Sequence, residues 1–427
     1  MSTSESTPRI LTIMGSGETA PTMVKTHRQL IARLANPKAA LLDTPYGFQE
    51  NAPELALRAK EYFDVSINTN ITPIGLTRID NADALALQQG LNVLTDANYV
   101  FAGPGSPTYA LRQWKNTQVP AILHHKLQTG GIVTFASAAA LTIGTRTVPV
   151  YEVYKCGEDP YWLEGLNLLG DLGIPAAVIP HYNNAEGGHH DTRFCYLGEA
   201  RLQFLEAQLN QGEYVLGIDE HTGIVIDLDA GSATIVGNGV VTMRVRGESR
   251  TYASGEVLSI ETLQDPDNGT AFVSTPGSST QAVSTPATAV PSESAPASLG
   301  SLADACKSSF DLAINSSDAM GATRAILDLE DGIKKWSADT LTGTDADTAR
   351  EVLRGMIVKL GEAATGGLAD PREKVSPFIE ALLAIRKIVR AEKRFDLSDI
   401  VRDALALASV EVRDTADGVE WFLQVPE

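Results

Sequence analysis

The chain has 427 residues, of which 43% are hydrophobic, and its formal net charge is −19. This length predicts two or three domains, each large enough to bury a core. The acidity argues against a general binder of nucleic acids or anionic membranes, because neutralising phosphate groups requires clustered Lys and Arg.

The N-terminal residues contain no basic region followed by an apolar stretch, and no run in the sequence reaches about 18 uninterrupted apolar residues. We therefore expect a cytoplasmic protein without a membrane partner. Three cysteines occur at wide spacing, Cys156, Cys195 and Cys306. Such spacing indicates neither a disulfide framework nor a cysteine zinc site.

Short apolar strands alternate with helices in the N-terminal part of the chain. The expected strands are residues 10–14, 39–42, 65–67, 72–74 and 99–102. Continuous apolar strands of this kind predict an α/β fold, with a mostly parallel sheet flanked by helices on both faces. Ligands in such folds bind at the carboxyl ends of the strands, where we expect the loops 15–19 and 103–109 to meet.

The stretch 130–141 is the first candidate for chemistry, because an apolar strand delivers Ser137 into a sharp turn followed by small residues. A serine in such a turn projects its hydroxyl above the sheet, beside backbone N–H groups that can face a developing oxyanion. The usual hydrolase pattern has glycine two residues before and two after the serine, where this chain has Phe135 and Ala139. The alternative is an ordinary serine that caps the following helix.

A histidine follows the next apolar strand, 176–179, within a loop that also contains His189 and His190. His181 lies just beyond the strand, where it is well placed to act as a general base. Adjacent histidines on a glycine-rich loop commonly face solvent, so we predict no metal site, and no cofactor is indicated. A helix is expected at 192–209.

Carboxylates follow the strand at 215–218, in the form of Asp219 and Glu220. From there to residue 263, short strands separated by glycine turns predict a small antiparallel extension.

Residues 264–300 are rich in Ser, Thr, Pro and Ala, a composition that cannot bury enough surface to fold. We expect a disordered linker there, between an α/β domain at 9–263 and a third region at 301–427. The third region has helical apolar spacing and predicts a separate α-helical bundle that ends in a short hairpin near 410–423.

The order of Ser137, His181 and then Asp219 with Glu220 resembles the dipeptidase E and cyanophycinase group of serine peptidases, whose fold is like that of class I glutamine amidotransferases. The resemblance covers about residues 9–262. The family's Gly-x-Ser-Ala-Gly-Ala turn falls on residues 135–140, where Ser137 and Ala138 match and both glycines do not.

The resemblance implies a role for each matching residue. It makes Ser137 the nucleophile, His181 the base and Glu220 its acidic partner. It also implies that the backbone N–H groups of Gly105 and Ala138 hold the oxyanion. The run around Asn183, with Arg193 downstream, looks like the family's substrate-binding loop. A small peptide or amide is the implied substrate. Glutamine is disfavoured as the substrate, because its hydrolysis in the related fold needs a cysteine and this turn has a serine.

The C-terminal region is similar to the C-terminal helical domain of cysteinyl-tRNA synthetases, on the residues 378–386, 391–395, 398–403 and 412–421. The sequence has no HIGH-like or KMSKS-like element, so we expect no cysteine-tRNA ligase activity. Acidic residues outnumber basic ones in this region, and we expect weak tRNA binding and a protein partner instead. The residues that could form one basic face are Arg386, Lys387, Arg390, Lys393, Arg394 and Arg402.

Two functions follow from these patterns. The first is a serine hydrolase of the peptidase type that uses Ser137, His181 and Glu220. The second is a catalytically silent protein that retains the amidotransferase-like pocket and binds partners through its helical domain. The side chain of Phe135 distinguishes the two, because a ring that fills the space above Ser137 would close the acyl site.

Overall fold

The computed structural model describes residues 7–185, 190–266, 298–336, 345–366, 371–415 and 418–423. The chain divides into two compact units, Met1–Ser301 with Gly332–Asp347, and Leu302–Asp331 with Thr348–Glu427. Most of the predicted linker, residues 267–297, lies outside the described residues.

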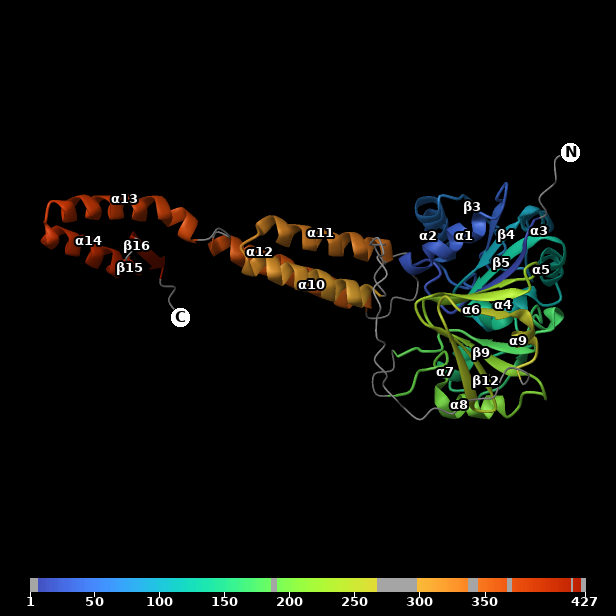
Figure 1. Ribbon diagram of the computed structural model, residues 1–427. Helices are drawn as coiled ribbons and strands as arrows, with labels where there is room; N and C mark the ends of the chain where they lie inside the picture. Colours follow the sequence, from blue (N-terminus) through green and yellow to red (C-terminus); the bar gives the residue numbers. More distant parts are fainter. Residues whose placement is uncertain are drawn as a thin grey trace. The chain divides into compact units, whose positions relative to one another are not determined.

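An eight-stranded sheet forms the centre of the first unit (Figure 1). Five neighbouring strands pair in parallel, which confirms the predicted mostly parallel sheet. On the other side of β1, the remaining three strands of the sheet pair in antiparallel fashion. The parallel strands in spatial order are β1 (Arg9–Met14), β5 (Gly131–Ala136), β4 (Tyr99–Ala102), β2 (Ala39–Leu42) and β3 (Ile71–Pro73); the antiparallel ones are β10 (Thr222–Asp227), β11 (Ser232–Gly237) and β14 (Val257–Ser259).

Helices cover both faces of this sheet, because its strands are apolar on both sides. Leu11 and Ile13 of β1 belong to a core that α3, α4 and α5 cover, whereas Ile10 and Met14 belong to a core beneath α1 and α2. The bounds of these helices are α1 (Val24–Ile31), α2 (Ala52–Tyr62), α3 (Ala84–Asp96), α4 (Pro107–Trp114) and α5 (Gln118–Thr129).

The predicted strand at 65–67 is wrong, since Phe63–Ile67 continues α2 as a π-helical turn. Phe63 and Ile67 are both buried and lie four residues apart, which is the spacing of a helical face. The turn ends at Asn68, whose φ of 61° is left-handed, a conformation that asparagine tolerates.

A second, four-stranded sheet in the order β13-β12-β9-β8 completes the first unit. The residues from 221 to 263 therefore do not form one antiparallel extension, because their strands divide between the two sheets. The strands of the second sheet are β8 (Ala176–Ile179), β9 (Tyr214–Ile218), β12 (Val240–Val245) and β13 (Glu248–Ala253). The shorter elements of this unit are α6 (Ser137–Thr142), β6 (Arg146–Thr147), α7 (Val150–Tyr154), β7 (Leu163–Glu164), α8 (Gly198–Glu206) and α9 (Ile260–Gln264).

The described residues of the C-terminal region form helices and a final hairpin, as the sequence predicts. Ile379 and Leu383 of α13 pack with Leu405 of α14 and with Val410 of the hairpin. No helix among the described residues has the length and apolarity needed to cross a membrane. The elements are α10 (Leu299–Asn315), α11 (Ala319–Trp336), α12 (Asp345–Gly366), α13 (Pro371–Ala391), α14 (Phe395–Leu407), β15 (Val410–Thr415) and β16 (Gly418–Leu423).

The side chain of His27 on α1 is fully buried beside the sheet. Its Nε2–H donates to the carbonyl oxygen of Glu18 at 2.7 Å, so Nδ1 accepts from the Tyr99 hydroxyl at 2.7 Å. Burial lowers the pKa of His27 from 6.5 to about 4, although the hydrogen bond to Glu18 opposes this shift. The imidazole is therefore neutral in the folded protein at pH 7.

We expect His27 to make the first unit acid-labile. Between pH 6.5 and about 4 the unfolded chain protonates this histidine and the folded chain does not, so stability falls as the pH falls. The contribution is about 1.4 kcal/mol per pH unit, or about 3 kcal/mol in total. Urea unfolding at several pH values should show a shallower pH dependence for His27→Gln. An equal pH dependence in the variant would contradict a neutral buried His27.

Candidate active site

Ser137 occupies a strained turn between β5 and α6. Its φ is 50°, in the left-handed region that L residues other than glycine rarely adopt, at a cost of about 1–2 kcal/mol. The surroundings impose this conformation, because all residues of β5 and α6 are buried. Ala139 N donates to Gly103 O at 3.2 Å, which joins the start of α6 to the loop after β4. Ser137 thus lies at the carboxyl edge of the parallel sheet.

The hydroxyl of Ser137 meets a histidine from the second sheet. Ser137 Oγ lies 3.0 Å from His181 Nε2, and both side chains are buried. His181 follows β8 after Pro180, and its φ of 49° is also left-handed. The distance is within the range for direct proton transfer between the two atoms.

The other ring nitrogen of His181 faces a carboxylate. Nδ1–H donates to Glu220 Oε1 at 2.9 Å, which leaves Nε2 to accept from the Ser137 hydroxyl. Two asparagines hold Glu220: Asn183 Oδ1 accepts from the backbone N–H of Glu220 at 2.8 Å, and Asn184 Nδ2 donates to Oε1 at 3.3 Å.

Glu220 is ionised in this arrangement. Burial alone would raise the pKa of its carboxyl group, but the hydrogen bonds from His181 and Asn184 hold the pKa below its ordinary value. A positive charge on either His181 or His221 would lower that pKa further. A carboxylate in this position fixes the imidazole tautomer and can stabilise an imidazolium.

The two predicted oxyanion donors lie on the loop after β4 and at the start of α6. Gly105 has a φ of 139°, and a Cβ placed on it would lie 2.1 Å from Pro45 O, so only glycine fits. Ala138 is the second residue of α6, where the backbone N–H has no partner within the helix. Neither N–H donates to another of the residues that the structure describes.

The two predicted substrate-binding residues both have partners within the protein. Asn183 is exposed and supports Glu220, as described above. Arg193 has a half-exposed side chain that binds Asp191 through two hydrogen bonds, from Nε at 2.9 Å and from Nη2 at 2.8 Å. His190 is exposed, and His189 lies outside the described residues.

Residues 194–196 form a left-handed turn beside His181 that the sequence reasoning missed. The φ angles of Phe194, Cys195 and Tyr196 are 61°, 54° and 67°. We expected a helix from residue 192, whereas α8 begins only at Gly198. That glycine, with a φ of 71°, is the only local signal of the turn, because the other three residues are not glycine.

The thiol of Cys195 is not a rival nucleophile in this site. Burial, reinforced by the charge of Glu220, raises the pKa of Cys195 to about 12, so the thiol is neutral at physiological pH. Its backbone N–H has a structural role, because it donates to His181 O at 3.1 Å.

Phe135 packs inside the core. Its side chain is fully buried, and its ring centroid lies 5.8 Å from that of Trp114 on α4. Since Ser137 Oγ reaches His181 at 3.0 Å, the phenyl ring does not separate the hydroxyl from the histidine.

No protein-family model matches the chain. Among curated proteins, the chain is 32% identical over 114 residues to the cysteine-tRNA ligase of Pseudarthrobacter chlorophenolicus, covering 25% of this chain and 23% of the ligase. It is also 32% identical over 135 residues to that of Micrococcus luteus, covering 29% and 27%. The chain thus spans about a quarter of the length of the curated relatives it matches.

Two solved structures align with a little over half of the chain. A peptidase from an acI-B1 Actinobacterium aligns at 21% identity with a TM-score of 0.49, covering 59% of this chain and 97% of the peptidase. A putative peptidase E protein from Listeria monocytogenes aligns at 14% identity with a TM-score of 0.34, covering 58% and 98%. The resemblance to cysteinyl-tRNA synthetases is thus found again among curated proteins.

We expect Gly105→Ala to destabilise the first unit by more than about 2 kcal/mol, because the new Cβ would clash with Pro45 O in a backbone conformation that alanine avoids. Gly75→Ala is the matched control, since Gly75 has a φ of 71° and open space around its Cβ position. This control should lose only about 1 kcal/mol. Urea unfolding of both variants compares the two losses, and equal losses would contradict the close approach at Gly105.

Proposed function

We propose that the chain is a serine hydrolase that cleaves a peptide or amide bond through an acyl-enzyme. The observation that supports this most directly is the pair of hydrogen bonds from Ser137 to His181 at 3.0 Å and from His181 to Glu220 at 2.9 Å. A nucleophile, a base and a group that orients the base are the three parts that such chemistry requires.

In the proposed mechanism, His181 Nε2 takes the hydroxyl proton as Ser137 Oγ attacks the substrate carbonyl carbon. Glu220 stabilises the resulting imidazolium, and the backbone N–H groups of Gly105 and Ala138 receive the oxyanion. His181 then protonates the leaving amine, and water cleaves the acyl-enzyme by the same route. These steps need no cofactor. We also propose that the protein is cytoplasmic.

We propose that Asn183 and Arg193 lie on the substrate side of the site. Arg193 uses Nε and Nη2 to bind Asp191, which leaves Nη1 of its half-exposed guanidinium for a substrate oxygen. Asn183 is exposed and adjoins Glu220. A small peptide or amide suits these groups.

The silent alternative depended on Phe135 filling the space above Ser137. The packing of this ring against Trp114 and the short contact between Ser137 and His181 favour the hydrolase instead.

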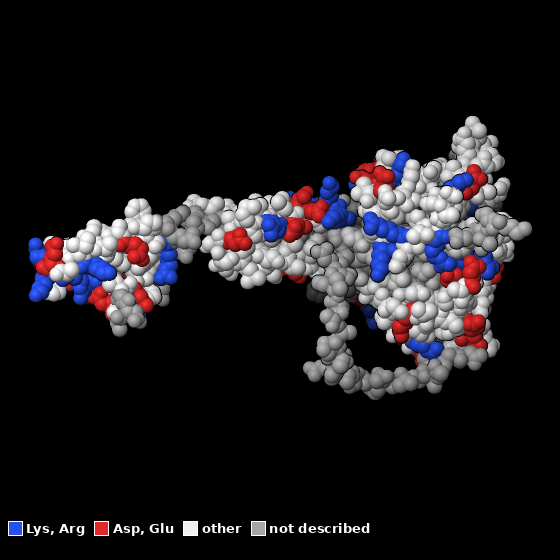
Figure 2. All heavy atoms as spheres, turned by 45° about the horizontal axis from the view of Figure 1, so that its top comes forward, with Lys and Arg blue, Asp and Glu red and all other residues white. Residues whose placement is uncertain are grey.

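For the C-terminal helices we propose a protein partner and not tRNA. Arg386, nearly fully buried, binds Asp414 with both terminal nitrogens at 2.7 and 3.0 Å, and Arg390 binds the same carboxylate at 2.9 Å. Arg394 pairs with Asp396. Three residues of the predicted basic face are therefore neutralised within the protein. Figure 2 shows Lys and Arg side chains beside Asp and Glu side chains over the part formed by α13, α14 and the terminal hairpin.

A fluorophosphonate probe should label the protein at Ser137. We expect Ser137→Ala to abolish labelling with a change in stability below about 1 kcal/mol, because a turn serine contributes little packing. Glu220→Gln should slow labelling by at least about 100-fold, because the histidine loses its orienting charge. The control is Ser106→Ala, which removes a buried serine hydroxyl that caps α4. Labelling of Ser137→Ala at the rate of the unsubstituted protein would contradict the proposal.

Arg386→Ala should lower the stability of the C-terminal unit by about 1–3 kcal/mol, because it removes a buried stem and a bidentate ion pair. Arg390→Ala is the matched control, since this side chain is 42% exposed and binds the same carboxylate, and it should cost less than about 1 kcal/mol. Urea unfolding of the full chain measures the loss of stability in each of the two variants. Nanomolar, salt-dependent tRNA binding that either variant abolished would argue against the protein partner.

A further inference from the structure

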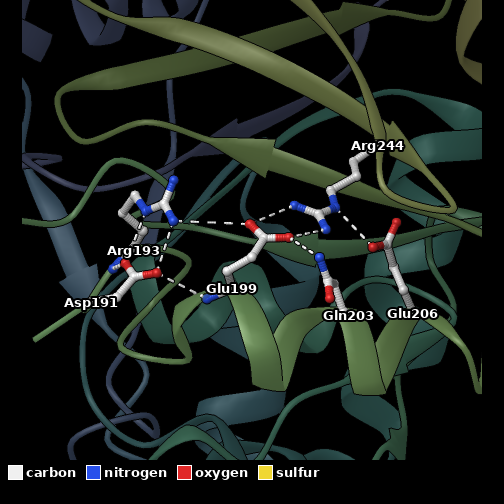
Figure 3. Close-up of polar contacts among 6 residues, drawn as sticks. All are labelled: Asp191, Arg193, Glu199, Gln203, Glu206 and Arg244. Atoms are coloured by element: carbon white, nitrogen blue, oxygen red, sulfur yellow. Dashed lines mark hydrogen bonds and ion pairs between the residues drawn. The ribbon is translucent and has the colours of Figure 1, made fainter.

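Figure 3 shows a connected group of charged side chains that come from both sides of the left-handed turn at residues 194–196 and from β12. At its centre is Arg244 of β12, whose side chain is only 5% exposed. Its guanidinium binds Glu206 Oε2 through Nε at 2.8 Å, and Glu199 through Nη1 at 3.2 Å and Nη2 at 2.6 Å. We call Asp191, Arg193, Glu199, Glu206 and Arg244 the Arg244 network.

The Arg244 network forms hydrogen bonds with the chain on both sides of the turn. Before the turn, Asp191 binds the Arg193 guanidinium and also accepts from the backbone N–H of Arg193 at 3.1 Å. After the turn, Asp191 Oδ2 accepts from the backbone N–H of Glu199 at 3.0 Å, in the first turn of α8. The Glu199 carboxylate in turn accepts a hydrogen bond from Arg244. Glu206, which also binds Arg244, accepts from Gly247 N through Oε1 at 3.0 Å. The turn is thereby tied to β12 and to the loop that follows it.

Both arginines also hold the side chain of Phe194, the first residue of the turn. The guanidinium carbons of Arg193 and Arg244 lie 4.9 Å and 5.6 Å from the centre of the Phe194 ring. The ring centroid of Tyr182, the residue after His181, lies 4.5 Å from that of Phe194. Phe194 therefore lies between the network and the segment that carries the histidine.

The backbone of the turn reaches His181 directly. Phe194 N donates to Tyr182 O at 3.0 Å, and Cys195 N donates to His181 O at 3.1 Å. Three successive left-handed residues cost about 1–2 kcal/mol each, so the turn needs anchors on both sides to persist. The network supplies these anchors.

A buried ion pair is by itself weak support for stability, because desolvating the charges opposes their attraction. The informative feature of Arg244 is its place, at the junction of α8, β12 and the ring that packs beside the histidine. From this placement we propose that Arg244 is a positioning residue for His181: it fixes the turn at 194–196, which orients the imidazole between Ser137 and Glu220. This inference rests on the proposed hydrolase function.

Arg244→Lys tests the proposal, because lysine keeps the charge and loses the planar fork that bridges Glu199 and Glu206. The matched control is Arg250→Lys, on β13 in the same sheet, where Arg250 pairs with Met243. Fluorophosphonate labelling of Ser137 is measured on protein that circular dichroism shows to be fully folded. We expect Arg244→Lys to label about tenfold more slowly or worse, because small displacements of a base cost large factors in rate. The control should label at an unchanged rate.

The second measurement is the low-field proton NMR signal of the hydrogen bond from His181 to Glu220, assigned by its absence in Glu220→Gln. We expect Arg244→Lys to broaden or remove this signal, whereas a merely stabilising role would leave it unchanged in folded protein. If Arg244→Lys does not fold, Phe194→Leu is judged by the same two measurements. Labelling at an unchanged rate together with an intact proton signal would overturn the proposal.

The two measurements separate this inference from the proposed function. If the unsubstituted protein is not labelled at all, the hydrolase proposal fails, and the proton signal alone decides whether Arg244 positions His181.

Discussion

The parallel pairing of β8 with β9 is the constraint on which the candidate site depends. Ile179 lies opposite Gly217 in this pair, so His181 and Glu220, two and three residues further on, leave the sheet at the same end. After Glu220 the chain passes within two residues into β10 of the first sheet. The carboxylate therefore lies at the crossing between the two sheets. The loop after β1 packs closely against the backbone at this crossing, since a Cβ on Gly15 would lie 2.1 Å from Asp219 O.

The residues of the candidate site were predictable because each follows an apolar strand. Ser137, His181 and the pair Asp219 and Glu220 come just after runs whose composition alone indicates burial, and the carboxyl ends of such strands share an edge. The choice of Glu220 within that pair came from the family resemblance, because the strand pattern alone does not separate the two carboxylates. The bounds of β2 and β4 are those expected from the sequence. Strong apolar runs and contacts between residues close in sequence are therefore sufficient to predict this part of the fold.

Other features depend on contacts that the linear sequence does not display. The strand expected at 65–67 is a π-helical turn, because burial of Phe63 and Ile67 decides its conformation. The helix expected from residue 192 begins later, since tertiary hydrogen bonds impose left-handed geometry on three ordinary residues. Arg244 lies 45 residues from Glu199 and 38 from Glu206, so no local pattern reveals their pairing. The pairing of Arg386 with Asp414 was hidden in the same way.

The division of the three site residues between two sheets has a mechanical consequence. Ser137 follows β5 of the first sheet, whereas His181 and Glu220 both follow strands of the second. Because β8 and β9 pair directly, a small rotation of one sheet against the other would change the distance from Ser137 to His181 more than the distance from His181 to Glu220. The separation of base from nucleophile is therefore the coordinate that such a motion would mainly adjust.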